Sequence, residues 1–103
     1  MKLIAAEKDG DLVVSISGDV DHHSATGIRE EIDRLLEEKK PNALLLDLGG
    51  TDFMDSSGLG LILGRKRKTE EMGIGLILIN PTEGCRKILR LAGMENKIEM
   101  KVI

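Results

Sequence analysis

The sequence predicts a single small α/β domain with a mixed, mostly parallel β-sheet and the element order β-β-α-β-α-β-α-β. From residue 23 onward, amphipathic runs of helix length alternate with apolar runs of strand length. That alternation is typical of parallel strands joined by right-handed crossovers. An Asp-Gly pair at positions 9 and 10 separates two earlier strand-like runs, which indicates an antiparallel hairpin. The chain has 103 residues, a length that suits one domain, and we expect residues 1–103 to form it.

The opening hairpin and the first helix follow from hydrophobic periodicity. Strands are predicted over residues 3–7 and 12–17, because apolar and polar residues alternate along the second run. A helix is predicted over residues 23–39, where apolar residues recur every three or four positions, and Pro41 should end it. Its inward positions are Ala25, Ile28, Ile32, Leu35 and Leu36.

Two continuous apolar runs, residues 43–48 and 76–79, predict the central strands of the sheet. Runs of this kind are typical of strands that are buried on both faces. A short strand over residues 97–102 closes the predicted sheet.

The helix predicted over residues 57–72 contains three glycines, each unfavourable by roughly 1 kcal/mol relative to alanine inside a helix. We expect its apolar residues Leu59, Ile62 and Leu63 to point inward. The glycines indicate close backbone packing or a surface that another molecule approaches; they are Gly58, Gly60 and Gly64.

The last helix has the clearest boundaries in the sequence. Asn80 is a natural N-cap, Pro81 suits the first helical position and Glu83 can close a capping box. Gly93 should end the helix. The predicted buried stripe comprises Cys85, Ile88, Leu89 and Ala92.

Composition excludes several classes of function. Fifteen Lys and Arg against eighteen Asp and Glu give a net charge of −3, which argues against a protein that wraps nucleic acid. Phe53 is the one aromatic residue, so stacking on bases is nearly excluded. A single cysteine, Cys85, rules out an internal disulfide. With no apolar run of spanning length and an early charge at the start of the chain, we expect a cytoplasmic protein without membrane partners.

Two loops, residues 18–24 and 49–58, contain the residues that could react or bind a partner. Loops that leave the carboxyl ends of parallel strands share one edge of the sheet, where sites collect. Asp55, Ser56 and Ser57 precede a predicted helix, and all three are good N-cap types. One interpretation is that they serve only as caps. The other is that one serine caps the helix and its neighbour accepts a phosphoryl group.

A phosphoserine at this place would act as a switch. It carries about −1.5 to −2 charges and would face the positive end of the helix dipole, so the fold would tolerate it. A partner docked beside Asp52 and Asp55 would meet a large new negative charge. Phe53 and Met54 lie in the same polar loop; we expect one of them in the core, and an exposed one would be a binding anchor.

The histidine pair invites a metal interpretation, which the sequence does not favour. His22 and His23 are adjacent and point different ways, and the chain offers no third histidine and no cysteine nearby as a ligand. Asp21 as a helix cap, with the histidines at an interface, is the better interpretation. No metal is therefore expected.

Enzyme interpretations are also disfavoured. A Ser-His-Asp hydrolase would lack the Gly-x-Ser-x-Gly elbow, and a chain this small leaves little room for a substrate pocket. The spacing of Gly58, Gly60 and Gly64 is not that of a dinucleotide-binding motif. We therefore predict neither catalytic residues nor a cofactor. The basic run at residues 65–68 is interpreted as a solvated helix face, and contact with an acidic partner or a phosphate is the alternative.

Residues 52–60, Asp-Phe-Met-Asp-Ser-Ser-Gly-Leu-Gly, closely resemble the signature of bacterial anti-sigma factor antagonists. These are the stand-alone members of the STAS (sulfate transporter and anti-sigma factor antagonist) domain family. Residues 18–23, Gly-Asp-Val-Asp-His-His, resemble the other characteristic loop of that family. The predicted element order matches the family over nearly the whole chain.

The resemblance implies a partner switch in sigma-factor control. The unphosphorylated antagonist would bind an anti-sigma factor that is also a GHKL-type serine kinase, and so release the sigma factor. The kinase would phosphorylate Ser56, with Asp55 orienting or polarising it, and a PP2C-type phosphatase would reverse the reaction. The protein would then be a substrate and a ligand, not an enzyme. The implied partner-binding residues are Asp19, Asp21, His22, His23, Asp52, Met54, Asp55, Ser56, Ser57 and Gly58.

A second hypothesis keeps the fold and changes the role. The chain would be a STAS-type scaffold or regulatory module of a sensory or transport complex, without a phosphorylation switch. Family members often carry a further C-terminal helix, and this chain ends soon after the last predicted strand, so assemblies that rely on that helix are not expected. The sequence leaves open the sigma factor, its signal, any nucleotide bound by the antagonist, and the oligomeric state.

Overall fold

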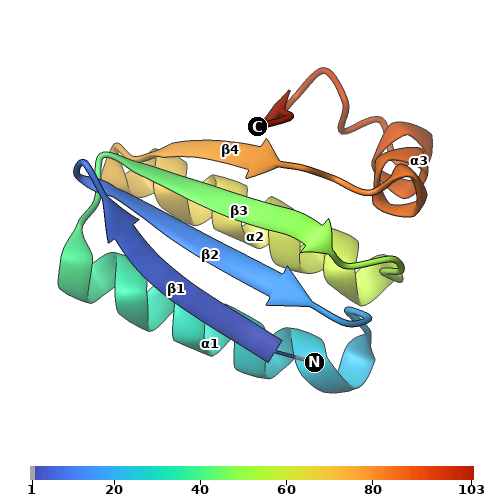
Figure 1. Cartoon of the computed structure of the whole chain (residues 1–103), viewed down its shortest axis with the longest axis horizontal. Coiled ribbons are helices and arrows are strands. Elements are labelled where there is room, and N and C mark those ends of the chain that lie inside the picture. The colour runs from blue at the N-terminus through green and yellow to red at the C-terminus, as the bar shows by residue number, and fades with distance from the viewer. Residues whose placement is uncertain (1) are drawn as a thin grey trace.

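A five-stranded sheet forms the centre of the computed structural model, which describes residues 2–103. The strands lie side by side in the order in which they occur in the chain (Figure 1). The first pair is antiparallel and the other three pairs are parallel, as the sequence predicts. The strands are β1 (Lys2–Lys8), β2 (Asp11–Ser17), β3 (Ala43–Gly50), β4 (Gly75–Ile79) and β5 (Glu99–Lys101).

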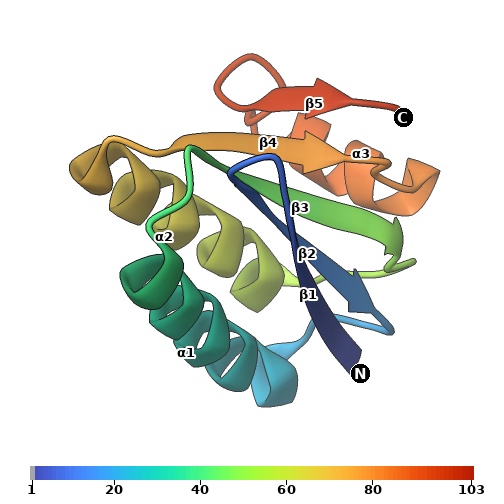
Figure 2. The ribbon, with the colours of Figure 1, turned by 60° about the vertical axis from the view of Figure 1, so that its left-hand side comes forward.

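Three helices connect the parallel strands, namely α1 (His22–Lys39), α2 (Ser56–Met72) and α3 (Glu83–Leu91). Helices α1 and α2 lie side by side on the same face of the sheet, whereas α3 lies beyond the carboxyl end of β4 (Figures 1 and 2). The element order confirms the prediction, and both long helices begin one residue before the predicted position. None of the helices in residues 2–103 combines the length and the apolar character needed to cross a membrane.

The core lies between the sheet and the two long helices. Alternate residues of β2 and β3 point into it, and Val14, Leu46, Ile32 and Ile62 are all essentially inaccessible to solvent. Burying a side chain of this size contributes roughly 1.5–3 kcal/mol relative to leaving it exposed. The alternation in β2 therefore confirms the prediction that this strand has one drier face.

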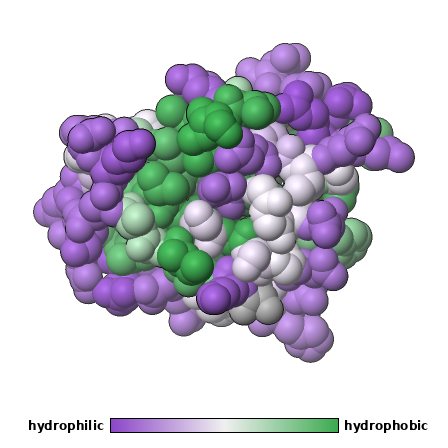
Figure 3. All heavy atoms as spheres, in the orientation of Figure 1, coloured by the Kyte–Doolittle hydropathy of each residue, from purple (hydrophilic) through white to green (hydrophobic). Residues whose placement is uncertain are grey.

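The prediction that β3 and β4 are buried on both faces is wrong in part. In β3, Leu44 and Leu46 are buried whereas Leu45 between them is only half-buried. The reason is that the two long crossover helices, α1 and α2, lie on one face, and no helix within residues 2–103 covers the other face (Figures 1 and 2). Figure 3 shows apolar side chains gathered on that uncovered face of the sheet.

Helix α2 has its predicted inward face at two of three positions, since Ile62 is buried and the half-buried Leu59 packs against the core. The prediction is wrong at Leu63, which is 46% exposed, whereas Leu61 is buried. Arg65 also lies on the buried stripe and is only 6% exposed, so the solvated-face prediction for residues 65–68 is wrong at this position. Because a charged residue occupies one of the buried positions, the spacing of the apolar residues alone does not reveal the buried face of this helix.

The N-terminus of α3 differs from the prediction. Thr82, and not Asn80, is the N-cap, and its hydroxyl accepts the backbone N–H of Cys85 at 3.3 Å. Asn80 adopts a left-handed backbone conformation with φ of 52° and donates its N–H to Lys101 in β5. Ala92 is exposed, so the predicted stripe ends at Leu89. Gly93 follows the helix at a positive φ of 73°, which confirms the predicted stop.

Candidate functional site

The two loops at the carboxyl edge of the sheet are joined by backbone hydrogen bonds. Gly18 donates its N–H to Gly50 at 2.9 Å, and Val20 donates to Phe53 at 3.0 Å. The Asp55 N–H donates to the carbonyl of Val20 at 3.2 Å, so Val20 and Met54 form a parallel bridge. The pairing of β2 with β3 thus continues into the loops, and it holds the starts of α1 and α2 at one edge, as the sequence predicts.

An aspartate caps each of the two helices. The Asp21 carboxylate accepts the N–H groups of His23 and Ser24 at 3.0 and 3.1 Å, and the Ser24 hydroxyl accepts the Asp21 N–H in return. These bonds, above all that from the Ser24 backbone, hold the pKa of Asp21 below its ordinary value. The predicted role of Asp21 as a cap is confirmed.

Helix α2 is capped by Asp55, whose Oδ1 accepts the N–H of Ser57 at 2.8 Å and that of Gly58 at 3.3 Å. The interpretation in which one serine caps this helix is therefore wrong. Asp55 precedes the first helical residue, and its carboxylate reaches the free N–H groups of the first turn. Both serine hydroxyls are left outside the cap.

Ser56 is the first residue of α2 and is exposed, whereas Ser57 is half-buried. The Ser56 hydroxyl is accessible from solvent at the positive end of the α2 dipole. An accessible hydroxyl at a helix N-terminus can receive a phosphoryl group without opening the fold.

Of the two adjacent apolar residues in the second loop, Phe53 is exposed and Met54 is buried. Phe53 is 48% exposed and Met54 is 1% exposed. Met54 and Gly58 therefore offer a partner no side-chain surface, although the resemblance implies both as binding residues. Phe53 is the accessible apolar group of the site, and its signal in the sequence is a lone aromatic residue in a polar loop.

The other residues implied in partner binding surround this edge. Asp19, His22, His23 and Asp52 are exposed, and Asp21 and Asp55 are half-buried beneath them as caps. The two histidine rings contact each other with centroids 5.7 Å apart. Within residues 2–103, no group of three or more His, Cys, Asp and Glu side chains has the arrangement needed to hold a metal ion.

Thr51 anchors the base of the second loop, a role that the sequence analysis missed. Its hydroxyl donates to the Ile16 carbonyl at 3.0 Å, which ties the loop to β2. Its own carbonyl accepts the Thr82 hydroxyl at 2.7 Å and the Cys85 thiol at 3.0 Å. Helix α3 packs so closely that a β-carbon at Gly84 would lie 2.5 Å from the Asp52 carbonyl oxygen. The loop is therefore fixed from both sides.

Comparison with known proteins places the chain in one family. The STAS domain family matches residues 2–102, so the chain belongs to it. An anti-sigma F factor antagonist of Lysinibacillus sphaericus is 36% identical over 83 residues, which are 81% of this chain and 71% of that protein.

Two solved structures are similar over nearly the whole length. The anti-sigma factor antagonist SpoIIAA in its unphosphorylated form has a TM-score of 0.85 and 28% identity, covering 99% of this chain and 88% of its own. The Bacillus protein SpoIIAA in its phosphorylated form has a TM-score of 0.78 and 28% identity, covering 99% and 91%.

Proposed function

We propose that this chain is an anti-sigma factor antagonist that is switched by phosphorylation of Ser56. In the unphosphorylated form it binds an anti-sigma factor, a serine kinase of the GHKL type, and thereby releases a sigma factor. A PP2C-type phosphatase restores the binding form. The protein is the ligand and the substrate of these enzymes and not an enzyme itself.

The observation that carries the proposal is that Ser56, the first residue of α2, is exposed and that its hydroxyl takes no part in the cap. The relatives that are antagonists of anti-sigma factors, and the phosphorylated state of one similar structure, support the same role. Asp55 acts in it as the cap that fixes where the helix begins, since its Oδ1 is already bonded to two backbone N–H groups.

Electrostatics explains why phosphorylation would act on binding and not on folding. A phosphate at the helix N-terminus is stabilised by roughly 0.3–1 kcal/mol. Two like charges about 8 Å apart near a protein surface repel each other by about 2 kcal/mol. Asp19 and Asp52 already make this edge acidic. A partner that binds the unmodified edge would therefore be repelled by the added charge of the phosphoryl group on Ser56, and would also have to accommodate its volume.

The experiment is to incubate the chain with a candidate anti-sigma factor kinase and ATP, and to map the modified residue by mass spectrometry. Phosphate on Ser56, absent from Ser56→Ala and retained in Ser57→Ala, is the expected result. Ser57→Ala is the matched control because it makes the same chemical change one residue further along the helix.

Binding is measured by calorimetry on the same variants. Ser56→Asp should weaken binding at least tenfold, while Ser56→Ala should bind as the wild type does and resist the switch. Equal affinities of Ser56→Asp and Ser56→Ala would contradict the switch and favour a scaffold role for the domain.

A further inference from the structure

The two bridged loops at the carboxyl edge of the sheet, residues 18–24 and 49–58, contain the hydrophobic residues Val20, Phe53 and Met54. Val20 and Met54 are buried in the core, whereas Phe53 is about half exposed. The other large hydrophobic residues that are exposed within residues 2–103 lie outside these loops, on β1, α2, α3 and at the C-terminal end. Phe53 is therefore the large apolar side chain that this edge presents to solvent.

The path of the backbone directs the Phe53 ring away from the core. The N–H of Val20 donates to the Phe53 carbonyl at 3.0 Å, and the N–H of Asp55 donates to the Val20 carbonyl at 3.2 Å. These two bonds make the parallel bridge at Met54. Successive side chains of a strand-like segment point to opposite sides. Because Met54 points into the core, the ring before it points outward.

The backbone that carries the ring is fixed on both sides. The first loop holds the Phe53 carbonyl through Val20. On the other side, α3 packs against the preceding residue, since a β-carbon at Gly84 would lie 2.5 Å from the Asp52 carbonyl oxygen. A phenylalanine on a fixed backbone has only two side-chain torsions left to order when it binds, so it offers a large contact area at a low cost in conformational entropy.

We propose that the Phe53 ring is the apolar anchor through which this chain binds its anti-sigma factor, and that the anti-sigma factor receives it in an apolar pocket beside its contact with Ser56. Buried aromatic anchors of this kind dominate the energetics of protein interfaces. The inference rests on the proposed function and adds to it the residue that supplies affinity, whereas Ser56 supplies the switch.

The position of the ring also defines its role in phosphorylation by the same partner. Phe53 precedes the acceptor Ser56 by three residues and lies outside α2, so its contact is made equally before and during phosphoryl transfer. An interaction of this kind lowers KM and leaves kcat unchanged.

Binding is tested by calorimetry with the candidate anti-sigma factor kinase. Phe53→Ala should weaken binding at least about tenfold, and Phe53→Leu, which keeps an apolar side chain, should recover most of that loss. Leu91→Ala is the control, because Leu91 is exposed at the C-terminal end of α3, and it should bind as the wild type does. Urea unfolding checks that the variants fold. Phe53→Gln, with a longer polar side chain, should bind as weakly as Phe53→Ala and repeats the test where alanine unfolds the chain.

Steady-state phosphorylation by the same kinase gives the second measurement. Phe53→Ala should raise KM for the chain about tenfold and leave kcat within about twofold of the wild type. A lower kcat with an unchanged KM would show that the ring only places Ser56, and would overturn the proposal. Wild-type affinity and KM in folded Phe53→Ala would overturn it as well. If the wild-type chain itself neither bound the kinase nor became phosphorylated, the proposed function would fail, which distinguishes that failure from failure of the anchor alone.

Discussion

Gly58 and Met54 lie so close together that a β-carbon on Gly58 would be 2.6 Å from the β-carbon of Met54. The same atom would lie 3.3 Å from the Val20 side chain. Both neighbours are buried and belong to the bridge between the two loops. The absence of a side chain at position 58 therefore allows α2 to start directly against the two bridged loops at the carboxyl edge of the sheet.

Gly58→Ala should destabilise the protein by about 1–3 kcal/mol, because the added methyl group overpacks a filled site. Gly60→Ala is the matched control: it adds the same group two residues later, where nothing lies within 4 Å, and should stabilise by up to about 1 kcal/mol. Urea unfolding of the two variants measures both effects. Similar midpoints for the two would contradict the contact at Gly58.

The capping bonds of Asp21 should make stability depend on pH. Its pKa in the folded state is lowered from 3.8, so the ionised form is favoured by folding. The contribution is present above the unfolded pKa and is lost as the pH falls through the lower folded pKa. Asp21→Asn should therefore flatten the pH dependence of the unfolding free energy below about pH 4. An equally steep slope in Asp21→Asn and in the wild type would contradict the capping bonds as its source.

The buried Arg65 of α2 places its Nε 3.0 Å from Oδ1 of Asp33 on α1, and this ion pair should respond unequally to the removal of each partner. Asp33→Asn leaves a buried guanidinium without its counter-charge and should destabilise by about 2 kcal/mol. Arg65→Met replaces the cation with an apolar chain of similar length, and should leave stability within about 1 kcal/mol of the wild type or increase it. Thermal unfolding distinguishes the two, and an equal loss in both would show that the pair is a net source of stability.

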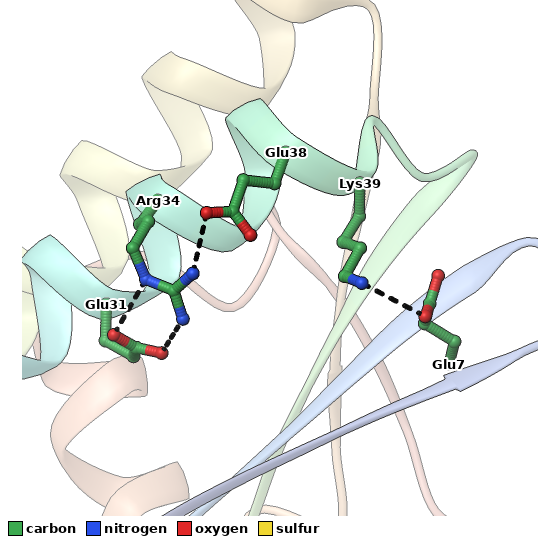
Figure 4. Close-up of polar contacts among 5 residues, drawn as sticks. All are labelled: Glu7, Glu31, Arg34, Glu38 and Lys39. Atoms are coloured by element: carbon green, nitrogen blue, oxygen red, sulfur yellow. Dashed lines mark hydrogen bonds and ion pairs between the residues drawn. The ribbon is translucent and has the colours of Figure 1, made fainter.

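An exposed ion-pair network on α1 provides the comparison for that experiment. Arg34 contacts both Glu31 and Glu38 along one side of the helix, while Lys39 reaches Glu7 of β1 at 3.5 Å (Figure 4). These side chains are well solvated, and exposed pairs contribute little. Arg34→Met should therefore leave the unfolding temperature nearly unchanged, in contrast to Asp33→Asn.

Cys85 should report on the separation of α3 from the second loop. The thiol is fully buried and bonded to the Thr51 carbonyl, and its burial raises its pKa. It should therefore react with a disulfide reagent only when α3 opens, and Thr82→Val, which removes the neighbouring bond to Thr51, should increase the reaction rate. If Cys85 in the folded protein reacted as fast as a fully exposed thiol, the result would contradict the burial of this side chain.

Most of the fold follows from periodicity, while errors occur where several residues compete for one role. Asp55, Ser56 and Ser57 are all cap types, and only the backbone path decides that the first of them caps α2. Phe53 and Met54 are both apolar, so the sequence predicts that one is buried without saying which. The uncovered face of the sheet could not be predicted, because a continuous leucine run has the same sequence pattern whether helices pack on one face of the strand or on both.

The carbonyl of Thr51 is held by groups that occur 31 and 34 residues later in the chain. During synthesis, the edge that carries Ser56 therefore lacks this support until Thr82 and Cys85 have left the ribosome, although the bond from Thr51 to Ile16 can already form. A nascent chain stopped before α3 would hold the loop from one side only. The order of synthesis thus delays the final shape of this edge until α3 has been made.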